Sequence, residues 1–222
     1  MAHTLAVLVS GGVDSCVLLE QMTKKYPVVF PLFVRQGLFW EPTELNYLHR
    51  FLLKIKTAAL RSLVILEEPI SDIYGRHWAT TGEQVPAADS QDNAVYLPGR
   101  NLLLIHKPAL WCAMNQVNTL ALATLKHNPF PDNSPLFFSS LEQAIGIALG
   151  KNISILRPFS NHSKTDVLLE GKHLPLEETF SCIRPVRELH CGSCNKCAER
   201  KRAFKDALLA DPTIYATSIS QL

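Results

Sequence analysis

Short apolar segments alternate with longer segments of helical periodicity along this chain of 222 residues. The apolar segments predict strands, and the periodic segments between them predict helices. The predicted strands are residues 5–9, 28–34, 63–66, 119–124 and 153–156, and the predicted helices are residues 16–25, 43–57, 102–116, 136–149 and 164–169. Pro108 is expected to kink or interrupt the third of these helices. The alternation is typical of an α/β fold with a parallel sheet and helices on both of its faces.

The first apolar segment runs directly into the sequence Ser10-Gly11-Gly12-Val13-Asp14-Ser15. Residues 5–9 suit a strand buried on both faces, and a helical pattern starts directly after the loop. The glycine pair permits a tight turn, and free amides at the start of a helix attract anions such as phosphate. We therefore expect a phosphate-binding loop. A turn that only caps the helix is the simpler alternative, but the glycine pair and three polar residues exceed what a cap requires.

This loop lacks the three spaced glycines of the dinucleotide fingerprint and the Gly-Lys-Ser/Thr ending of the Walker loop. It resembles the SGGxDS loop of the ATP pyrophosphatases. In that group of enzymes the loop holds the pyrophosphate that is released when ATP adenylates a substrate, and the aspartate lies near the phosphates and their magnesium. The resemblance therefore implies that Asp14 lies close to the phosphates of ATP.

Four cysteines near the end of the chain have the spacing C-x8-C-x2-C-x2-C: Cys182, Cys191, Cys194 and Cys197. Tetrahedral zinc favours four thiolates, and two-residue gaps let neighbouring cysteines converge on one ion. We expect a structural zinc site, because four protein ligands leave no open position for water. Basic residues that would partly offset the charge of such a centre are Lys196, Arg200, Lys201 and Arg202.

Other interpretations of the cysteines are paired disulfides and a redox-active Cys-x-x-Cys of the kind that thiolating enzymes use in sulfur transfer. No secretory signal segment opens the chain, so we expect a reducing cytoplasm, which disfavours disulfides. The sulfur-transfer interpretation stays open. The thiols of Cys16 and Cys112 lie in apolar helical patterns and are expected to be buried core residues.

Composition indicates an enzyme that acts on a small molecule. The chain is 47% hydrophobic, which suffices for one substantial core, and its net charge of +2 provides no large basic field for a polynucleotide. No nucleic-acid partner is therefore expected. The apolar stretch 101–117 is interrupted by His106, Lys107 and Pro108, so no membrane span is expected. We predict a nucleotide-binding domain over residues 1–175 and a zinc-binding segment with a helix over residues 176–222.

Residues 71–97 lack clear periodicity, and a loop of this length in a compact domain is usually functional or mobile. The loop leads into Pro98-Gly99-Arg100-Asn101, where Pro-Gly predicts a turn and Asn101 is a candidate N-cap for the next helix. Arg100 would then project near a helix N-terminus, where its guanidinium could hold a phosphate or carboxylate. A surface arginine in an ordinary turn is equally compatible with the sequence.

Three segments of the chain together resemble the 7-cyano-7-deazaguanine synthase family in their order and spacing. They are the loop at Ser10, the segment Pro98-Gly99-Arg100-Asn101, and the cysteine cluster followed by residues 198–204. The resemblance covers nearly the whole chain. The resemblance implies a Rossmann-like ATP pyrophosphatase domain with a C-terminal zinc site, commonly in a homodimer. It implies that 7-carboxy-7-deazaguanine, ammonia and ATP are converted, through an acyl adenylate and an amide, to the nitrile precursor of queuosine. A second activation of the amide oxygen is the straightforward route to the nitrile.

Carried onto this sequence, the resemblance implies roles for individual residues, with ATP, Mg2+ and Zn2+ as cofactors. The residues with implied catalytic roles are Asp14, Ser15 and Arg100. The residues implied to bind the nucleotide are Val9, Ser10, Gly11, Gly12, Val13, Asp14, Ser15, Cys16 and Asn101. The implied metal ligands are Cys182, Cys191, Cys194 and Cys197. No side chain need act as a covalent nucleophile, so catalysis would come mainly from positioning and from offsetting phosphate charge.

Residues 121–134 depart from the family pattern, which ends in a Tyr-Pro-Asp-Cys-Arg-like sequence that faces the deazaguanine. Phe130 could stack on a purine-like ring, or be a core residue, and Asp132 could accept hydrogen bonds from the base. Asn133 and Ser134 stand in place of the cysteine and arginine, and Lys126 stands where an acid is usual.

Several functions therefore stay open beside the usual nitrile synthesis with a rebuilt pocket. The reaction could stop at the amide, or the activated deazapurine could be transferred to an amine other than ammonia. A tRNA-thiolating ATP pyrophosphatase and a non-catalytic nucleotide-binding protein are further alternatives. The intact SGGVDS sequence at residues 10–15 argues against the last of these.

Overall fold

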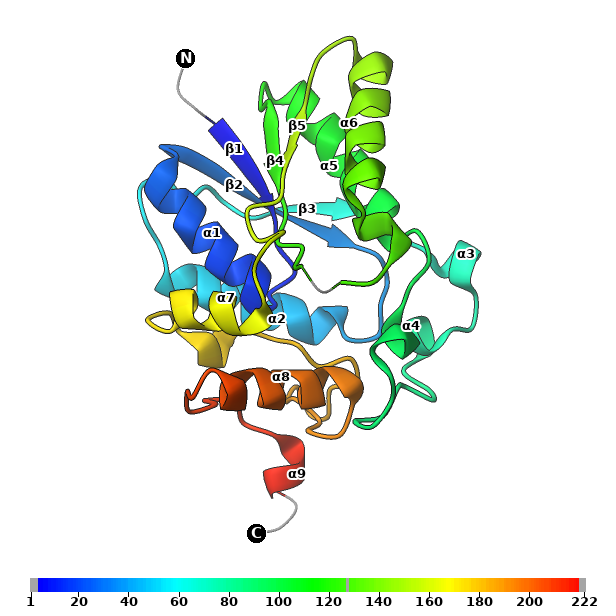
Figure 1. The fold of residues 1–222 in the computed structure, drawn as a ribbon, viewed down its shortest axis with the longest axis vertical. Helices are drawn as coiled ribbons and strands as arrows, with labels where there is room; N and C mark the ends of the chain where they lie inside the picture. Colours follow the sequence, from blue (N-terminus) through cyan, green and yellow to red (C-terminus); the bar gives the residue numbers. More distant parts are fainter. Residues whose placement is uncertain (1–3, 127, 220–222) are drawn as a thin grey trace.

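The computed structural model describes residues 4–126 and 128–219 of the protein (Figure 1). The strands form one sheet in the order β3-β2-β1-β4-β5, and all neighbouring strands are parallel. The strands are β1 (Thr4–Leu8), β2 (Val28–Arg35), β3 (Val64–Glu67), β4 (Thr119–Ala121) and β5 (Ser154–Leu156). The five predicted strands and the parallel α/β architecture are therefore confirmed.

Helices connect the strands and cover the sheet. The long helices are α1 (Val13–Lys25), α2 (Glu41–Lys54), α5 (Arg100–Met114), α6 (Pro135–Leu149), α7 (Lys164–Gly171) and α8 (Asn195–Asp206). The short helices are α3 (Ser71–Tyr74), α4 (Trp78–Thr81) and α9 (Ala216–Ile219), with 3-10 turns at Asp92–Val95, Pro131–Asn133 and Leu176–Glu178. The segment 71–97, expected to be a loop, thus contains α3, α4 and one 3-10 turn between irregular stretches.

The central strand β1 divides the core into two layers, because successive side chains of a strand point to opposite faces. Leu5 and Val7 belong to a buried cluster with α1, α2 and α7, whereas Ala6 belongs to a second cluster with α5 and α6. The central residues of β1, Leu5, Ala6 and Val7, are fully buried on both faces of the strand, as the unbroken apolar run predicts. This arrangement confirms the Rossmann-like fold with helices on both faces.

The strand order reverses beside β1. From β1 the chain first builds outward through β2 to β3, and it later returns to place β4 and then β5 on the other side. In open α/β sheets, ligands bind in the crevice beyond the carboxyl ends of the strands at such a switch point. The loop that follows β1 and the segment that follows β4 therefore flank the expected binding crevice.

The start and the middle of α5 differ from two expectations. Gly99, in the left-handed region with φ +72°, is the N-cap residue, so the expectation that Asn101 is the cap is wrong. The helix also continues through Pro108, so of the expected kink or interruption the interruption does not occur. Pro108 is buried. Tertiary packing therefore offsets the lost backbone hydrogen bond.

Helix α8 packs against α7 and extends the core of the sheet domain (Figure 1). Ala203 and Phe204 of α8 belong to the same buried cluster as Leu5 and Val7 of β1. The fully buried Arg200 donates to the carbonyl of Leu176 (2.9 Å). The division after residue 175 stays a prediction. Within residues 4–126 and 128–219, no helix combines the length and apolar character that a membrane crossing requires.

Candidate active site

A cavity of about 480 Å³ lies at the carboxyl ends of β1 and β4, at the switch point of the sheet. Its walls come from the loop after β1, the segment after β4 and the first residues of α5, α7 and α8. The polar residues that line it include Ser10, Asp14, Ser15, Asp92, Arg100, Asn101, Thr124, Asn128, Ser163, Lys164, Lys196 and Glu199. The predicted phosphate loop and the Arg100 segment, far apart in sequence, thus face one space.

The hydroxyl groups of the phosphate loop hold its turn together. The Ser15 hydroxyl donates to the carbonyl of Gly12 (3.1 Å) and accepts the backbone N–H of Ser10 (3.1 Å). The amide of Gly12 donates to the hydroxyl of Ser10 (3.3 Å). The two serines therefore fix the loop while they also line the cavity.

Gly11 lies on the side of the loop that contacts α2, and it does not line the cavity. Its φ is +80°, and a Cβ atom there would lie 3.1 Å from the backbone oxygen of Glu44 and 3.4 Å from the Cβ of Leu48. Its carbonyl accepts the N–H of Phe180 (2.7 Å). Glycine is required here for the backbone conformation and for close contact with α2, so Gly11 acts by positioning the loop.

The first turn of α1 leaves the backbone amides of Val13, Asp14 and Ser15 without acceptors inside the helix. Such amides and the helix dipole form an anion site. The side chains of Val13 and Cys16 are buried, so these residues can reach a nucleotide only through their backbones. Burial, reinforced by the charge of Glu44, raises the pKa of the Cys16 thiol far above its ordinary value, in accord with a core residue.

Asp14 forms an ion pair with Lys164, the first residue of α7, with 2.6 Å between Nζ and Oδ2. Burial alone would lower the pKa of Lys164, but the Asp14 and Glu199 carboxylates outweigh it and raise that pKa. The other oxygen of Asp14, Oδ1, is buried with no hydrogen-bond partner among the described residues. Carboxylate oxygens are preferred magnesium ligands, so Asp14 fits the metal role implied by its loop.

Lys164 is a site residue that sequence reasoning did not assign. The signal for it is the sequence Ser163-Lys164-Thr165-Asp166, because a serine followed three residues later by an acid is typical of a helix start. The predicted helix over residues 164–169 is confirmed as α7: Ser163 is its N-cap, and with Asp166 it forms a capping box. The capping box fixes the start of α7 and therefore the backbone of Lys164 beside the phosphate loop.

Arg100 lines the cavity from the start of α5, and β2 orients it. Its Nε donates to Oε1 of Gln36 (3.2 Å), a fully buried side chain that follows the last residue of β2. The N–H groups of Gln36 and Gly37 both donate to the Glu41 carboxylate at 2.7 Å. Burial raises the pKa of Glu41, against the effect of these hydrogen bonds. Gln36 and Glu41, which no sequence pattern indicated, therefore support the orientation of Arg100.

Asn101 and Asp132 lie side by side, but only Asn101 lines the cavity. The backbone N–H of Asn101 donates to Oδ2 of Asp132, and its side-chain amide donates to the Asp132 carbonyl, both at 2.9 Å. Asp132 is buried, and its carboxylate accepts an N–H group that the first turn of α5 leaves without an acceptor inside the helix. Asp132 therefore lies behind Asn101 and does not line the cavity. The sequence, in contrast, predicts a direct contact between Asp132 and the substrate.

The aromatic ring of Phe130 lines the cavity and stacks on Tyr96, with 4.6 Å between ring centroids and 25° between planes. Phe130 is therefore no core residue, and one face of its ring is already covered by Tyr96. A purine-like ring that stacks on Phe130 would use the opposite face.

The residues that replace the family's cysteine and arginine have structural roles in this fold. Ser134 is the N-cap of α6, where its hydroxyl accepts the N–H of Phe137 (3.1 Å). The amide of Asn133 donates to the carbonyls of Leu125 and Asn128, both at 3.3 Å. Neither residue lines the cavity, nor does the exposed Lys126, and His127 of the same segment lies outside the described residues. The segment after β4 thus contributes no cation to this cavity from its described residues.

The four cysteines of the C-terminal segment converge as the spacing predicts. Their sulfur atoms all lie within 4.8 Å of one another, and all four residues are buried. Two Sγ–Sγ pairs, Cys182–Cys194 and Cys191–Cys197, are 3.9 Å apart. Zinc–sulfur bonds of about 2.3 Å in a tetrahedron require sulfurs about 3.8 Å apart, so the donor set fits zinc. The cysteines are free thiols without disulfide bonds.

Backbone amides stabilise the cysteine sulfurs, whereas the nearby cations have varied partners. Sulfur atoms accept N–H groups from residues 184 and 191–193 at 3.2–3.4 Å. Lys201 donates to the carbonyl of Gly192 inside the cluster (2.9 Å). Lys196 instead pairs with Glu199 at 2.6 Å, and both line the cavity. One of the expected zinc-neighbouring cations therefore belongs to the active-site wall.

Comparison with known proteins identifies the family of this chain. Residues 4–208 match the family model described as "Queuosine biosynthesis protein QueC". The chain is 27% identical to 7-cyano-7-deazaguanine synthase 1 of Desulfitobacterium hafniense, over 91% of this chain and 92% of that protein. It is 28% identical to the 7-cyano-7-deazaguanine synthase of Desulfotalea psychrophila, over 94% and 97% of the two chains. With the family model spanning both the phosphate loop and the cysteine cluster, the chain belongs to the QueC family of queuosine biosynthesis proteins.

Proposed function

We propose that this protein is an ATP-dependent carbon–nitrogen ligase that makes 7-cyano-7-deazaguanine from 7-carboxy-7-deazaguanine, ammonia and ATP. The observation that carries the proposal is the convergence of the Asp14 loop and Arg100 on one cavity at the switch point of the sheet. Family membership and the names of the relatives support the same reaction.

The first step in this proposal is attack of the substrate carboxylate on the α-phosphorus of ATP, with pyrophosphate as the leaving group. The free amides of α1 bind the pyrophosphate, and the guanidinium of Arg100 offsets the charge that develops near the carboxylate. Asp14 would hold magnesium, which when bound offsets the charge of the phosphates. Ser15 acts by keeping the loop in its binding conformation.

Ammonia then attacks the activated carbonyl carbon, AMP leaves, and the substrate becomes an amide. Loss of the amide oxygen requires a second ATP: the oxygen attacks its α-phosphorus at the same phosphate loop and pyrophosphate leaves, and departure of AMP and of the two amide protons then gives the nitrile. No covalent nucleophile is needed, because each leaving group carries the oxygen away as phosphate ester. The contribution of the protein is to hold the reacting groups in place.

We propose that the deazapurine lies against the free face of Phe130, near the side chains of Asn128 and Thr124. The Thr124 hydroxyl is buried at the cavity wall and has no hydrogen-bond partner among the described residues. Asp132 would influence the substrate through Asn101, whose position it sets. This arrangement provides polar contacts for the base without the arginine that the family pattern has at the position of Ser134.

The remaining features of the proposal concern the zinc segment, the assembly and the cellular location. Zinc at the four cysteines would hold residues 176–222 on the sheet domain and has no open position for chemistry. A homodimer is proposed through α6, whose exposed Leu136 and Ile147 lie on a helix with Glu142 as its one charged residue. We place the protein in the cytoplasm, where a reducing environment keeps the thiols free.

The test is to incubate zinc-loaded protein with magnesium, ATP, ammonium and 7-carboxy-7-deazaguanine, and to follow pyrophosphate release and product mass together. A nitrile product that depends on Asp14 and Arg100 is the expected result. An amide product would mean that this chain forms the amide but, unlike a nitrile synthase, does not dehydrate it. A product that contains another amine would favour an amine-transferring enzyme, and no turnover would overturn the substrate assignment and favour a tRNA-thiolating enzyme.

A further inference from the structure

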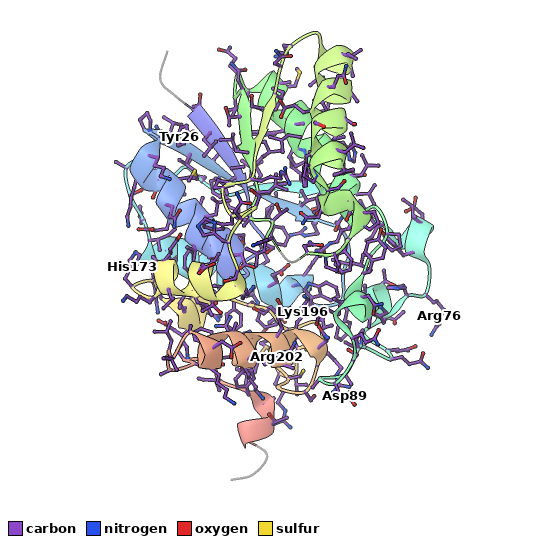
Figure 2. All side chains as sticks on the ribbon, in the orientation of Figure 1. Tyr26, Arg76, Asp89, His173, Lys196 and Arg202 are labelled. Atoms are coloured by element: carbon purple, nitrogen blue, oxygen red, sulfur yellow. The ribbon has the colours of Figure 1, made fainter. Side chains whose placement is uncertain are left out.

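Lys196 lies between two metal ligands and yet belongs to the wall of the active-site cavity. It follows Cys194 and precedes Cys197, at the first turn of α8, and its ammonium group pairs with Glu199 at 2.6 Å. Both side chains line the cavity. Figure 2 shows Lys196 on the side of α8 that faces the sheet. The cysteine cluster therefore sets the position of a cation in the active site.

Three cations among the described residues line this cavity, and Lys196 is held least firmly. Arg100 is tied to the buried Gln36, and Lys164 pairs with Asp14 with both side chains mostly buried (23% and 20% exposed). The Lys196–Glu199 pair is more open, at 35% and 32% exposure, and joins neighbours on one helix. Half-buried pairs between neighbours on one helix contribute little to stability, so Lys196 can change partners at small cost.

Lys196 lines the same cavity as the phosphate loop, which contributes Ser10, Gly12, Asp14 and Ser15 to the wall. Lys164 pairs with Asp14 of this loop, and Lys196 pairs with Glu199. Two ion pairs of the wall, one on the phosphate loop and one on the zinc-binding helix, thus border one space. The Lys196 pair is the more exposed of the two, so its ammonium group is the cation that a bound phosphate can recruit.

We infer that Lys196 leaves Glu199 and binds the β- and γ-phosphates of ATP, so that the metal-binding segment completes the nucleotide site. The inference rests on the proposed use of ATP. A triphosphate brings several negative charges, and charge-assisted hydrogen bonds from one ammonium group to two phosphates outweigh a single half-buried ion pair between neighbours on one helix. Glu199 holds the lysine in place until the nucleotide arrives.

The test measures binding of α,β-methylene ATP with magnesium, and of AMP, to the zinc-loaded full chain by calorimetry. K196Q removes the proposed contact, and E199Q removes its competitor. K205Q is the matched control, because Lys205 is an exposed residue of the same helix and does not line the cavity. We expect K196Q to weaken analogue binding about tenfold or more, the effect of losing one hydrogen bond to a charged group. AMP binding should stay unchanged, since AMP lacks the β- and γ-phosphates.

E199Q separates this role from a structural one. If the Lys196–Glu199 pair only stabilised α8, both variants would weaken binding together. Under our inference E199Q leaves analogue binding unchanged or tighter, and K205Q matches the wild type. Unchanged analogue binding in K196Q, an equal loss for AMP, or a parallel loss in E199Q would overturn the inference, with zinc content measured for each variant.

The inference and the proposed function fail in different ways. A wild-type chain that makes no nitrile but binds the analogue in a Lys196-dependent manner would overturn only the assigned substrate. A chain that makes the nitrile while K196Q binds the analogue normally would overturn only the role of Lys196.

Discussion

Lys164 donates a hydrogen bond of 2.6 Å to the Oδ2 atom of Asp14, a residue 150 positions earlier in the chain. The bond joins the first turn of α7 to the phosphate loop after β1. It leaves Oδ1 of Asp14 buried and without a hydrogen-bond partner among the described residues. One oxygen thus orients the carboxylate, and the other is left for a ligand of the kind that the loop is expected to bind.

The variant D14N keeps the shape of this side chain but removes its charge. We expect kcat/KM to fall roughly a hundredfold to a thousandfold, the scale of losing one main electrostatic contact in an active site. Stability should fall as well, because Lys164 loses its charged partner. Pyrophosphate release checks the rate, and thermal unfolding checks the fold. D72N, at an exposed aspartate of α3, serves as the control and should behave as the wild type. Near-normal turnover in D14N would contradict the role of this carboxylate.

The variant G11A tests whether the phosphate loop needs glycine because of its neighbours as well as its backbone. G37A is the matched control, since Gly37 has a similar φ (+77° against +80°) but open space where a Cβ atom would lie. We expect a loss of about 1 kcal/mol of unfolding free energy for G37A and about 2–3 kcal/mol for G11A, measured by urea denaturation. G11A should also lose nucleotide binding. Equal destabilisation of the two variants would show that the contact with Glu44 has no effect.

The variant S134A tests whether Ser134 caps α6 or contacts the substrate. Loss of the cap should lower the unfolding free energy by about 1 kcal/mol while the KM for the deazapurine stays constant. S139A is the control, because the Ser139 hydroxyl lies on the same helix and donates to the Leu136 carbonyl without capping it. A raised KM with unchanged stability would show that Ser134 contacts the substrate and does not act as a cap.

Metal removal should uncouple α8 from the sheet domain. The helix begins directly after Cys194, contains Cys197 and contributes Phe204 to the main core. We expect C194S to lose bound zinc and to lower the unfolding free energy by roughly 3 kcal/mol or more, because structural zinc binding is coupled to folding. C112A, at a buried thiol outside the cluster, should keep its zinc and lose only packing energy. Full zinc content and wild-type stability in C194S would contradict a structural metal site.

The sequence by itself determined the features of this protein that depend on local pattern. The unbroken apolar run of residues 5–9 predicted a strand buried on both faces, and the glycine pair after it predicted a sharp turn into α1. The spacing of the four cysteines predicted one metal-binding cluster, since short gaps bring neighbouring ligands together in any fold. These features are encoded within short stretches of the chain, so a single sequence suffices to find them.

Only the tertiary structure decided which distant residues meet. The sheet order places the end of β2 beside the start of α5, so that Gln36 orients Arg100 from 64 positions away. The same packing turns Asp132 onto the backbone of Asn101 and brings Lys196 of the cysteine cluster to the cavity that the phosphate loop also lines. Periodicity and spacing carry no information on such contacts, because they arise from the order of the strands and from the packing of α5, α7 and α8 around the switch point.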